Sequence, residues 1–579
     1  MFTMLGVVYG IIRKLFTSIS IGAIAVLIIG YIHIAKYGFR GTPLFPEDFA
    51  FGSQAGTLTK FIDMSQVVRL IIAVILVLIL GILLDRLSQK WLKRESSAPQ
   101  NVWWRRYRII SRIAIISISI CGFMITTDFI RHHGKEREIP IPMLNSKFTE
   151  WNQVTNYSDN GFIIGFLYNT SKLIISEPSG YTEPRLVELG QSLSLQKTLD
   201  DSKRVNIANT DYNIIVILNE SFYDPSIISD YYQYTGGDVT PNLHRIQKES
   251  LSGYMFSPDY GGGTANIEYE VLTGLTNYWF KTVPYTNLIP SKETVPSLAS
   301  YMKSTGLHTA TIHPFVGGMY KRDAVLPKLG FDEFIDIHGF SEIEKEGASE
   351  YANDRTAYGK TLDYIRNTPE KDFISLITMQ NHAPYLRNEY GSSDFVITNV
   401  PEQSEKDSIE TYLMTAHKSD QYLGEFIEKL KTFDEKTIVL MYGDHAPGVY
   451  PDVLENKDHK VSNLIRLTPY IIYANFDFQS GFDINSTKNS TTEADFSDVL
   501  TGYSTELPVT TPNCLTNLML NIFSLQKPSN YYLLDTVCKE NPILTDVYFG
   551  NKSPFDSTEL SAYNLLTYDL VAGKQYSQK

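Results

Sequence analysis

The sequence predicts an α/β protein in which N-terminal transmembrane helices precede a domain with a mostly parallel sheet covered by helices. Two observations carry this prediction. Three long apolar stretches lie within residues 1–131, and beyond residue 211 short β-rich runs alternate with helix-like stretches. Long apolar stretches are typical of membrane spans. Continuous apolar strands separated by amphipathic helices are typical of a parallel sheet with both faces covered.

The three apolar stretches each have the length of a spanning helix, which is roughly 18–20 residues. The apolar opening from Met1 to Ile12 is too short to span at about 1.5 Å per residue. It is either an interfacial segment or the tail of an earlier helix, and the sequence leaves both open. The predicted spans are Leu15 to Ile34, Val67 to Leu84 and Ile113 to Ile130.

Basic residues between the second and third spans predict the orientation of this anchor. By the positive-inside rule that loop is cytoplasmic, so the third span runs outward and the chain after it is extracellular. A signal peptide is the rival interpretation, but several spans and the lack of an obvious small-residue cleavage site disfavour it. We therefore expect a multi-pass protein of the cell membrane. The basic residues are Arg86, Lys90, Lys93, Arg94, Arg105, Arg106 and Arg108.

Charge is divided unevenly along the chain. Residues 1–140 hold 17 Lys and Arg against 8 Asp and Glu, and because the whole chain has a formal net charge of −13, the remainder carries −22. An acidic domain is a poor binder of nucleic acid, so we expect no nucleic-acid partner.

Three cysteines are too few for a disulfide scaffold. Cys121 lies inside an apolar stretch, which leaves Cys514 and Cys538 as a possible pair. Neither has a CxxC or Cys/His neighbourhood, so the preferred interpretation is that both are buried small residues.

Four segments follow from these patterns. We expect a transmembrane anchor over residues 1–131, a proline-interrupted connector over 132–210, the catalytic domain over 211–510 and a C-terminal lobe packed on it over 511–579. The predicted strands are Asn213 to Leu218, His308 to Ile312, Phe373 to Met379, Thr437 to Tyr442 and Tyr470 to Tyr473. The clearest helices are Val295 to Ser304 and Tyr412 to Leu430.

Acidic and imidazole side chains follow four of these strands. In a sheet of this class, ligands bind beyond the carboxyl ends of the strands. A single Glu or His after a strand is more often a cap or turn residue, but a shared placement favours a site. Asp and His side by side suit a divalent ion such as Mn or Zn. The residues are Asn219 and Glu220, His313, His382, and Asp444 with His445.

A glycine-rich segment, Tyr260-Gly261-Gly262-Gly263-Thr264-Ala265-Asn266, supplies a hydroxyl to this set. Three glycines let the backbone approach a ligand closely, and Thr264 stands at the expected start of a helix, where phosphate binds well. A nearby metal would lower the pKa of the Thr264 hydroxyl so that it attacks phosphorus. The simpler alternative is a flexible loop with a helix-capping threonine.

The chain resembles the lipoteichoic acid synthase-like glycerol phosphate transferases, which belong to the alkaline phosphatase and sulfatase superfamily. The resemblance covers most of the chain and rests on the order and spacing of several motifs. These are the multi-span anchor with the loop Arg40-Gly41-Thr42-Pro43-Leu44-Phe45-Pro46, Asn219-Glu220-Ser221, the glycine loop before Thr264, the stretch from His313 to Arg322, Asn381-His382, and Gly443-Asp444-His445.

The resemblance implies a sulfatase-like fold and assigns roles to the motif residues. Thr264 is implied as the nucleophile, and one divalent cation, Mn in preference to Mg, as the cofactor. Phosphatidylglycerol is implied as the donor, with a glycerol phosphate polymer of the lipoteichoic acid type or another cell-surface glycan as the acceptor. The implied metal ligands are Glu220, Thr264, Asp444 and His445, and the implied substrate-binding residues are His313, Tyr320, Arg322 and His382.

Three departures from the synthase pattern put the headgroup and acceptor in question. Phe315 stands where those synthases carry an acidic residue, the nucleophile loop reads Gly-Gly-Gly-Thr-Ala-Asn in place of their Gly-Lys-Thr-Ser, and fewer complete spans precede the domain. Among the implied substrate-binding residues, Tyr320 stands in place of a tryptophan. The expected reaction is a two-step transfer through a phosphothreonine ester. A phosphoethanolamine transferase and a catalytically silent membrane receptor are the alternatives. A sulfatase activity is disfavoured because no Cys/Ser-x-Pro-x-Arg segment lies near Thr264.

Overall fold

The chain forms two compact units, Met1–Thr149 with Gln153–Leu173, and Glu150–Asn152 with Ile174–Lys579. Each unit is described by itself. The computed structural model describes residues 2–40, 43–46, 48–49, 64–92, 102–132, 153–170, 175–280, 282–454, 456, 458–478, 480, 496, 507–549 and 556–579.

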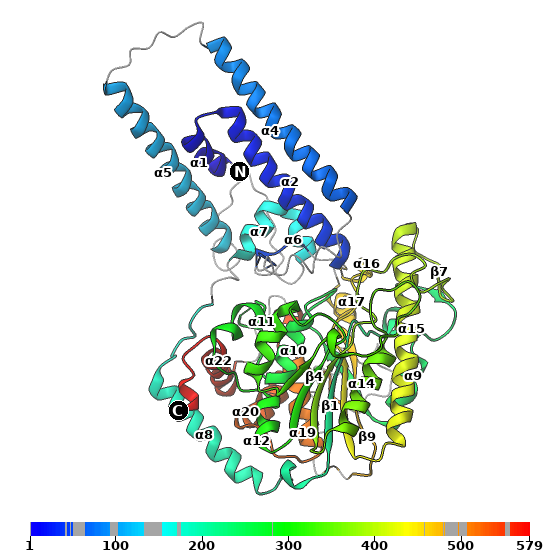
Figure 1. Cartoon of the computed structure of the whole chain (residues 1–579). Helices are drawn as coiled ribbons and strands as arrows, with labels where there is room; N and C mark the ends of the chain where they lie inside the picture. The colour runs from blue at the N-terminus through cyan, green and yellow to red at the C-terminus, as the bar shows by residue number, and fades with distance from the viewer. Residues whose placement is uncertain are drawn as a thin grey trace. The chain divides into compact units, whose positions relative to one another are not determined.

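Long apolar helices make up most of the first unit (Figure 1). Within the described residues of this unit, three helices are long and apolar enough to cross a membrane, over Leu15–Tyr37, Ser65–Lys90 and Ile109–Thr127. These agree with the three predicted stretches to within a few residues at most ends, while the orientation stays a prediction. The helices of this unit are α1 (Phe2–Ile12), α2 (Leu15–Arg40), α4 (Met64–Leu92), α5 (Val102–His132), α6 (Gln153–Asn160) and α7 (Phe162–Asn169).

Buried polar contacts hold this unit together. The Asp85 carboxylate of α4 accepts hydrogen bonds from the backbone N–H groups of Phe16 and Thr17 at the start of α2. The start of a helix carries unsatisfied N–H groups, so this carboxylate caps α2. In the motif segment from Arg40 to Pro46, Leu44 donates its N–H to His33 Nδ1 and accepts the Tyr157 hydroxyl. Gly41 and Thr42 lie outside the described residues.

The second unit is built on a seven-stranded sheet with the order β3-β9-β8-β1-β6-β4-β5 (Figure 1). Strands β8, β1, β6, β4 and β5 pair in parallel, whereas β9 is antiparallel to both of its neighbours. The sheet is therefore mostly parallel, as predicted. The strands are β1 (Asn213–Asn219), β3 (Leu251–Phe256), β4 (His308–Ile312), β5 (Glu333–Ile335), β6 (Asp372–Ile377), β8 (Thr437–Gly443) and β9 (Leu467–Ala474); β2 (Tyr234–Thr235) and β7 (Val396–Ile397) form a separate ribbon.

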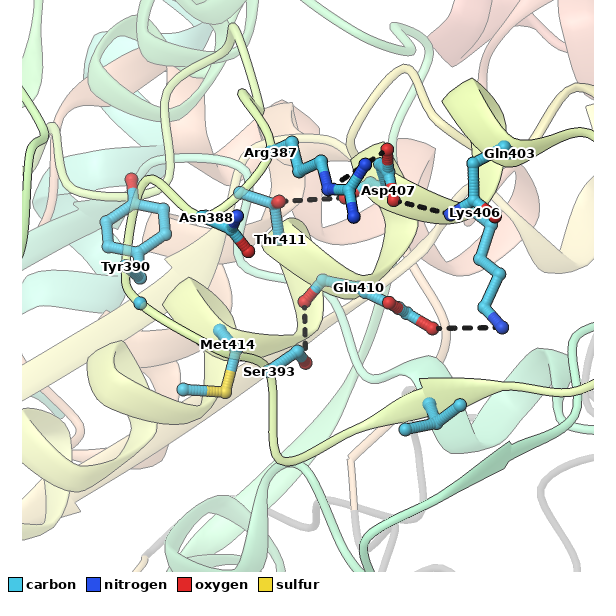
Figure 2. Close-up of a pocket in the computed structure, with 12 residues that line it drawn as sticks. Arg387, Asn388, Tyr390, Ser393, Gln403, Lys406, Asp407, Glu410, Thr411 and Met414 are labelled. Carbon is cyan, nitrogen blue, oxygen red and sulfur yellow. Dashed lines mark hydrogen bonds and ion pairs between the residues drawn. The ribbon is translucent and has the colours of Figure 1, made fainter.

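Helices cover the sheet, and α9, α14 and α15 pack on one face. The first turns of α15 also line a surface pocket together with residues 387–396 (Figure 2). The helices are α8 (Glu183–Asp201), α9 (Pro241–Glu249), α10 (Thr264–Thr273), α11 (Pro284–Asn287), α12 (Leu298–Ser304), α13 (Arg322–Val325), α14 (Asp354–Asn367), α15 (Gln403–Lys431), α16 (Pro451–Leu454), α17 (His459–Leu464), α19 (Pro512–Ile522), α20 (Ser529–Glu540), α21 (Asp546–Phe549) and α22 (Thr558–Val571).

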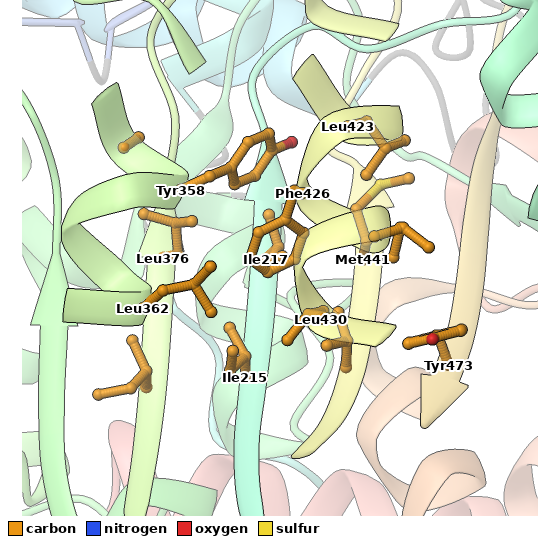
Figure 3. Packing of buried hydrophobic residues seen from close by; sticks show 14 of the residues in the cluster. Ile215, Ile217, Tyr358, Leu362, Leu376, Leu423, Phe426, Leu430, Met441 and Tyr473 are labelled. Carbon is orange, nitrogen blue, oxygen red and sulfur yellow. The ribbon is translucent and has the colours of Figure 1, made fainter. Parts of the chain in front are cut away.

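The core on this face joins the central strands to α14 and α15 (Figure 3). Ile215 and Ile217 of β1 are fully buried against Leu362 of α14 and Phe426 of α15. Every residue of β1 is buried, so neither face of this strand is open to solvent. Burying a side chain of this size contributes roughly 1.5–3 kcal/mol, so this packing holds the strand ends in fixed positions.

Two expectations about this unit were wrong. Cys514 of α19 and Cys538 of α20 form a disulfide, instead of being separate buried thiols. Their Cα atoms lie 6.0 Å apart because the two helices pack against each other. The helix expected over Tyr412 to Leu430 begins nine residues earlier, at Gln403. The domain boundaries expected from the sequence stay predictions. Residues 153–170, which belong to the expected connector, are helical and lie in the first unit.

Candidate active site

The carboxyl ends of the parallel strands bring the predicted residues to one edge of the sheet. Glu220 directly follows β1, His313 follows β4, and Asp444 follows β8. Their side chains are 3%, 1% and 0% exposed. A buried cluster of ionisable groups is costly unless its members are paired or bind a ligand, so this edge is the candidate site.

Glu220, Asp444 and His445 form a compact group of metal-ligating type. One ligand atom from each lies within 4.8 Å of the other two. His445 Nε2 is 3.2 Å from Asp444 Oδ2 and 3.9 Å from Glu220 Oε1. Oxygen and imidazole ligands in this arrangement suit Mn, Mg or Zn.

Electrostatics at this group favour a bound cation. Burial raises the pKa of the Asp444 carboxyl to about 7. Burial, together with the neighbouring charge of Asp444, also raises the pKa of Glu220. Two carboxylates held together away from water repel each other, and a divalent cation between them would reverse that cost. The residues present therefore fit a divalent metal ion.

Thr264 lies against this group at the start of α10. Its hydroxyl donates a 3.2 Å hydrogen bond to Glu220 Oε2, and the residue is 6% exposed. The glycines before it have φ angles of 65°, 147° and 105°, which only glycine adopts readily. A side chain at Gly263 would meet the Asp259 carboxylate at 2.4 Å. The glycine loop is therefore required by its backbone path, and it delivers Thr264 to the group.

Two hydrogen bonds tie the glycine loop to the segment that carries Asp444 and His445. Gly261 donates its N–H to the Ala446 carbonyl, and the Ser257 hydroxyl donates to the Asp444 carbonyl. Asp259 accepts the Asn266 side chain and lies close to Gly263. Ser257 and Asp259 were not predicted, although both fall just before the glycine run. They fix Thr264 relative to the ligand group.

Arg322 is buried in an ion pair instead of lying on the surface. Its Nε and Nη2 atoms donate to Glu268 Oε2 at 3.0 and 2.8 Å, and the two side chains are 2% and 1% exposed. Its Nη1 atom lies 3.3 Å from His313 Nε2. This burial excludes a solvent-exposed salt bridge as the role of Arg322.

His313 continues this chain of contacts. Its Nδ1 atom lies 3.1 Å from the Ile377 carbonyl oxygen. Because a carbonyl only accepts, Nδ1 carries the proton of the neutral ring and donates it. Nε2 is then the acceptor for Arg322 Nη1. Burial and the charge of Arg322 lower the pKa of His313 well below its ordinary value. His313 is therefore neutral near pH 7.

Tyr320 lies beneath Arg322, whose guanidinium is 5.2 Å from the ring centroid. Tyr320 and Lys321 have φ angles of 56° and 58°, a conformation that costs of order 1–3 kcal/mol for such residues. The strained turn holds the ring against the arginine. Phe315, one of the departures from the synthase pattern, is 9% exposed and meets the His313 ring edge-on, with a centroid distance of 6.1 Å.

His382 is half-buried, and its neighbour Tyr351 was missed from the sequence. His382 Nδ1 lies 2.7 Å from the Ala383 carbonyl and 3.1 Å from the Tyr351 hydroxyl. The charge of His382 contributes to the pKa of both Glu220 and His313, which places it within electrostatic reach of the ligand group. Tyr351 follows no strand, so its position in the sequence gives no sign that it belongs to the site.

Comparisons with known proteins agree with this geometry. The Sulfatase family model matches residues 212–503, half of the chain. A protein of Rhizobium meliloti (strain 1021) named for cyclic beta-1,2-glucan modification is 28% identical over 426 residues, which is 72% of this chain and 61% of the relative. Lipoteichoic acid synthase of Staphylococcus saprophyticus is 25% identical over 262 residues, which is 43% of this chain and 38% of the synthase. The chain thus spans less than two thirds of either relative.

Among solved structures, the chain is similar to the Streptococcus pyogenes phosphoglycerol transferase GacH in complex with sn-glycerol-1-phosphate. The TM-score is 0.56 and the sequence identity 27%, and the match covers 69% of this chain and 97% of that one. The family model, the relatives and the fold agree with the motifs around Thr264 and Asp444. The chain belongs to the sulfatase family of the alkaline phosphatase superfamily, in which it resembles the lipoteichoic acid synthase-like members.

Proposed function

We propose that this chain is a membrane-bound phosphotransferase that moves glycerol phosphate from phosphatidylglycerol, through an ester on Thr264, to a hydroxyl of a glycerol phosphate polymer or a surface glycan. The observation that carries the proposal is the hydrogen bond between Thr264 Oγ1 and Glu220 Oε2, beside Asp444 and His445. A hydroxyl needs a stabilised ionised form in order to attack phosphorus, and this group is where a cation would stabilise it.

Glu220, Asp444, His445 and the Thr264 oxygen would hold one divalent cation, with Mn preferred over Mg. When bound, the cation supplies positive charge that lowers the pKa of the hydroxyl and offsets charge on the phosphoryl oxygens. The two buried carboxylates and the imidazole orient Thr264, and the ties from Ser257 and Gly261 keep its oxygen in place.

In the first step, Thr264 Oγ gives up its proton to solvent and attacks the phosphorus of the donor, and the bond from phosphorus to the diacylglycerol oxygen breaks. That oxygen takes a proton from solvent and leaves as the alcohol. In the second step, an acceptor hydroxyl attacks the phosphothreonine ester while His382 takes its proton. The bond from phosphorus to Thr264 Oγ breaks, Thr264 regains a proton from solvent, and His382 returns its own proton to solvent. Neutral His313 accepts a hydrogen bond from Arg322 Nη1 and so helps to hold the guanidinium, which is the cation proposed to bind the phosphate.

The donor proposal is supported by the similarity to GacH, whose structure contains sn-glycerol-1-phosphate. We propose two classes of acceptor, a glycerol phosphate polymer and a surface glycan, because the relatives differ. One relative is named as a lipoteichoic acid synthase and another for cyclic beta-1,2-glucan modification. Three helices long and apolar enough to cross a membrane would keep the site near a lipid donor. We propose, with the positive-inside rule, that the catalytic domain is extracellular.

The test is a turnover assay with the full chain in detergent, supplied with phosphatidylglycerol and Mn. Release of diacylglycerol is expected from the wild type, and none from Thr264→Ala. Thr198→Ala on the exposed face of α8 is the matched control and should retain full activity. Cleavage of phosphatidylethanolamine in place of phosphatidylglycerol would favour the phosphoethanolamine alternative. No release from either lipid would favour the silent receptor and contradict the proposal.

A further inference from the structure

A polar pocket of about 200 Å³ lies at the surface of the second unit (Figure 2). One wall is the start of α15, and the other is the segment 387–396 that follows His382. Pockets for drug-sized ligands range over roughly 300–1,000 Å³. This pocket is smaller, so it suits a single ring.

The charged residues of the pocket form two loose pairs of opposite sign. Arg387 Nε is 3.7 Å from Asp407 Oδ2, and Lys406 Nζ is 3.7 Å from Glu410 Oε1. Both distances exceed the roughly 2.7–3.2 Å of a hydrogen bond. A ligand hydroxyl accepts from a cation and donates to a carboxylate, so each pair matches the two-sided hydrogen bonding of a hydroxyl group.

The pocket carries no net charge, since its two cations balance its two carboxylates. Tyr390, Val396 and Met414 add apolar surface beside these polar groups. Carboxylates repel phosphate, and residues 141–579 together carry a charge of −22. The chemistry therefore favours a neutral polyhydroxyl ring over a glycerol phosphate unit.

The pocket is connected to the candidate active site through α15. The Thr411 hydroxyl in the pocket donates to the Leu386 carbonyl, and one turn further the Thr415 hydroxyl donates to the Asn381 side chain. Tyr412, on the same turn, donates to the carbonyl of Ser221, next to Glu220. Residues 381–387 therefore run from His382 to the pocket along a rigid helix.

We propose that this pocket binds one neutral sugar ring of a glycan acceptor while another part of that glycan presents its hydroxyl to Thr264. The assignment of the sugar as acceptor rests on the proposed phosphotransferase function. The pocket then selects a neutral glycan over a glycerol phosphate polymer, because only the former places hydroxyl groups between Arg387 and Asp407 without bringing a phosphate next to the carboxylates.

Binding is tested by saturation-transfer NMR on the full chain in a detergent without a sugar headgroup. The probes are neutral oligosaccharides of glucose, galactose and mannose, and glycerol phosphate oligomers of equal length. At least one neutral oligosaccharide should bind. Its affinity should fall roughly tenfold or more in Arg387→Ala and in Asp407→Asn, since each removes a charged hydrogen-bond partner.

Arg366→Ala is the matched control, because Arg366 is also an exposed arginine paired with an aspartate, Asp363. It should bind the sugar as the wild type does. Asp407→Asn keeps the size of the side chain and so guards against misfolding. Binding of none of the sugars, equal binding by the variants, or equal binding of glycerol phosphate oligomers would each overturn the proposal.

Donor cleavage is measured separately on the same variants. Arg387→Ala should release diacylglycerol from phosphatidylglycerol as the wild type does, while transfer to the bound oligosaccharide falls. If the wild type binds sugar at this pocket but releases no diacylglycerol, the phosphotransferase function fails and the sugar site stands. If it releases diacylglycerol but binds no sugar, the sugar site fails alone.

Discussion

The Tyr351 hydroxyl lies 3.1 Å from His382 Nδ1, and both groups contact the carbonyl oxygen of Ala383, at 2.9 and 2.7 Å. Because a carbonyl only accepts, Nδ1 of the imidazole carries the proton in this arrangement. The other nitrogen, Nε2, is then the basic one. The Ala383 carbonyl thus fixes the tautomer of His382, and Tyr351, which donates to the same carbonyl, holds the ring beside it. A general base for the acceptor hydroxyl needs both.

Tyr351→Phe should slow transfer to the acceptor roughly tenfold. This is a fraction of the rate enhancement of about 10²–10⁴-fold that a general acid–base group contributes, because His382 itself remains. The first step, release of diacylglycerol, should be nearly unchanged, because Thr264 does not depend on His382 in that step. Single-turnover assays of the two steps provide the measurement. Tyr364→Phe, at a half-buried tyrosine bonded to Glu333, is the control. Equal loss in both steps would count against a role specific to His382.

Variants of the buried ion pair between Arg322 and Glu268 should separate its effect on stability from its effect on activity. Glu268→Ala should cost about 3–5 kcal/mol of unfolding free energy, because it leaves Arg322 buried and unpaired. The double variant Glu268→Met with Arg322→Met should recover most of that stability yet remain inactive. Thermal unfolding and the diacylglycerol assay measure the two effects. An active double variant would contradict the role of Arg322 in binding phosphate.

His244 predicts how stability depends on pH. Its Nε2 and Nδ1 atoms lie 3.0 and 2.7 Å from the carboxylates of Asp224 and Asp238. Burial lowers its pKa, but the hydrogen bonds and charges of the two carboxylates outweigh burial and raise the pKa to about 9. Because the pKa of His244 is raised on folding, its ion pairs stabilise the folded state. This stabilisation is fully present below the unfolded pKa of about 6.5 and is lost as pH rises through about 9.

We therefore expect His244→Gln to destabilise the protein by roughly 1–3 kcal/mol at pH 6, a range discounted for partial solvent screening. The difference from the wild type should shrink toward zero by pH 10. Thermal unfolding of both proteins across this range, followed by tryptophan fluorescence, is the measurement. A difference that stayed constant or grew with pH would show that the imidazole acts without its charge.

The fold was predictable where hydrophobic runs carry the signal. Strand β1 is a continuous apolar run that ends at Asn219, and β8 ends just before Asp444, so the edge with the polar residues could be located. Strand β3 was missed because it contains Gly253, and β5 because it has only three residues. The antiparallel direction of β9 could not be predicted, since an apolar run has no direction.

The candidate site was predictable to the extent that its residues follow strands or a glycine run. The partner of Arg322 is Glu268, 54 positions away on α10, so neither its burial nor its pairing is visible in the run Tyr320-Lys321-Arg322-Asp323. Tyr351 lies in a segment without regular structure. Such residues meet only when the sheet and its helices are packed.

Peptide mass spectrometry of the enzyme quenched during turnover of phosphatidylglycerol tests the central claim most directly. We predict one glycerol phosphate group on the peptide that contains Thr264, present in the wild type and absent from Thr264→Ala. Turnover by the wild type with no adduct on that residue, or full activity of Thr264→Ala, would contradict it.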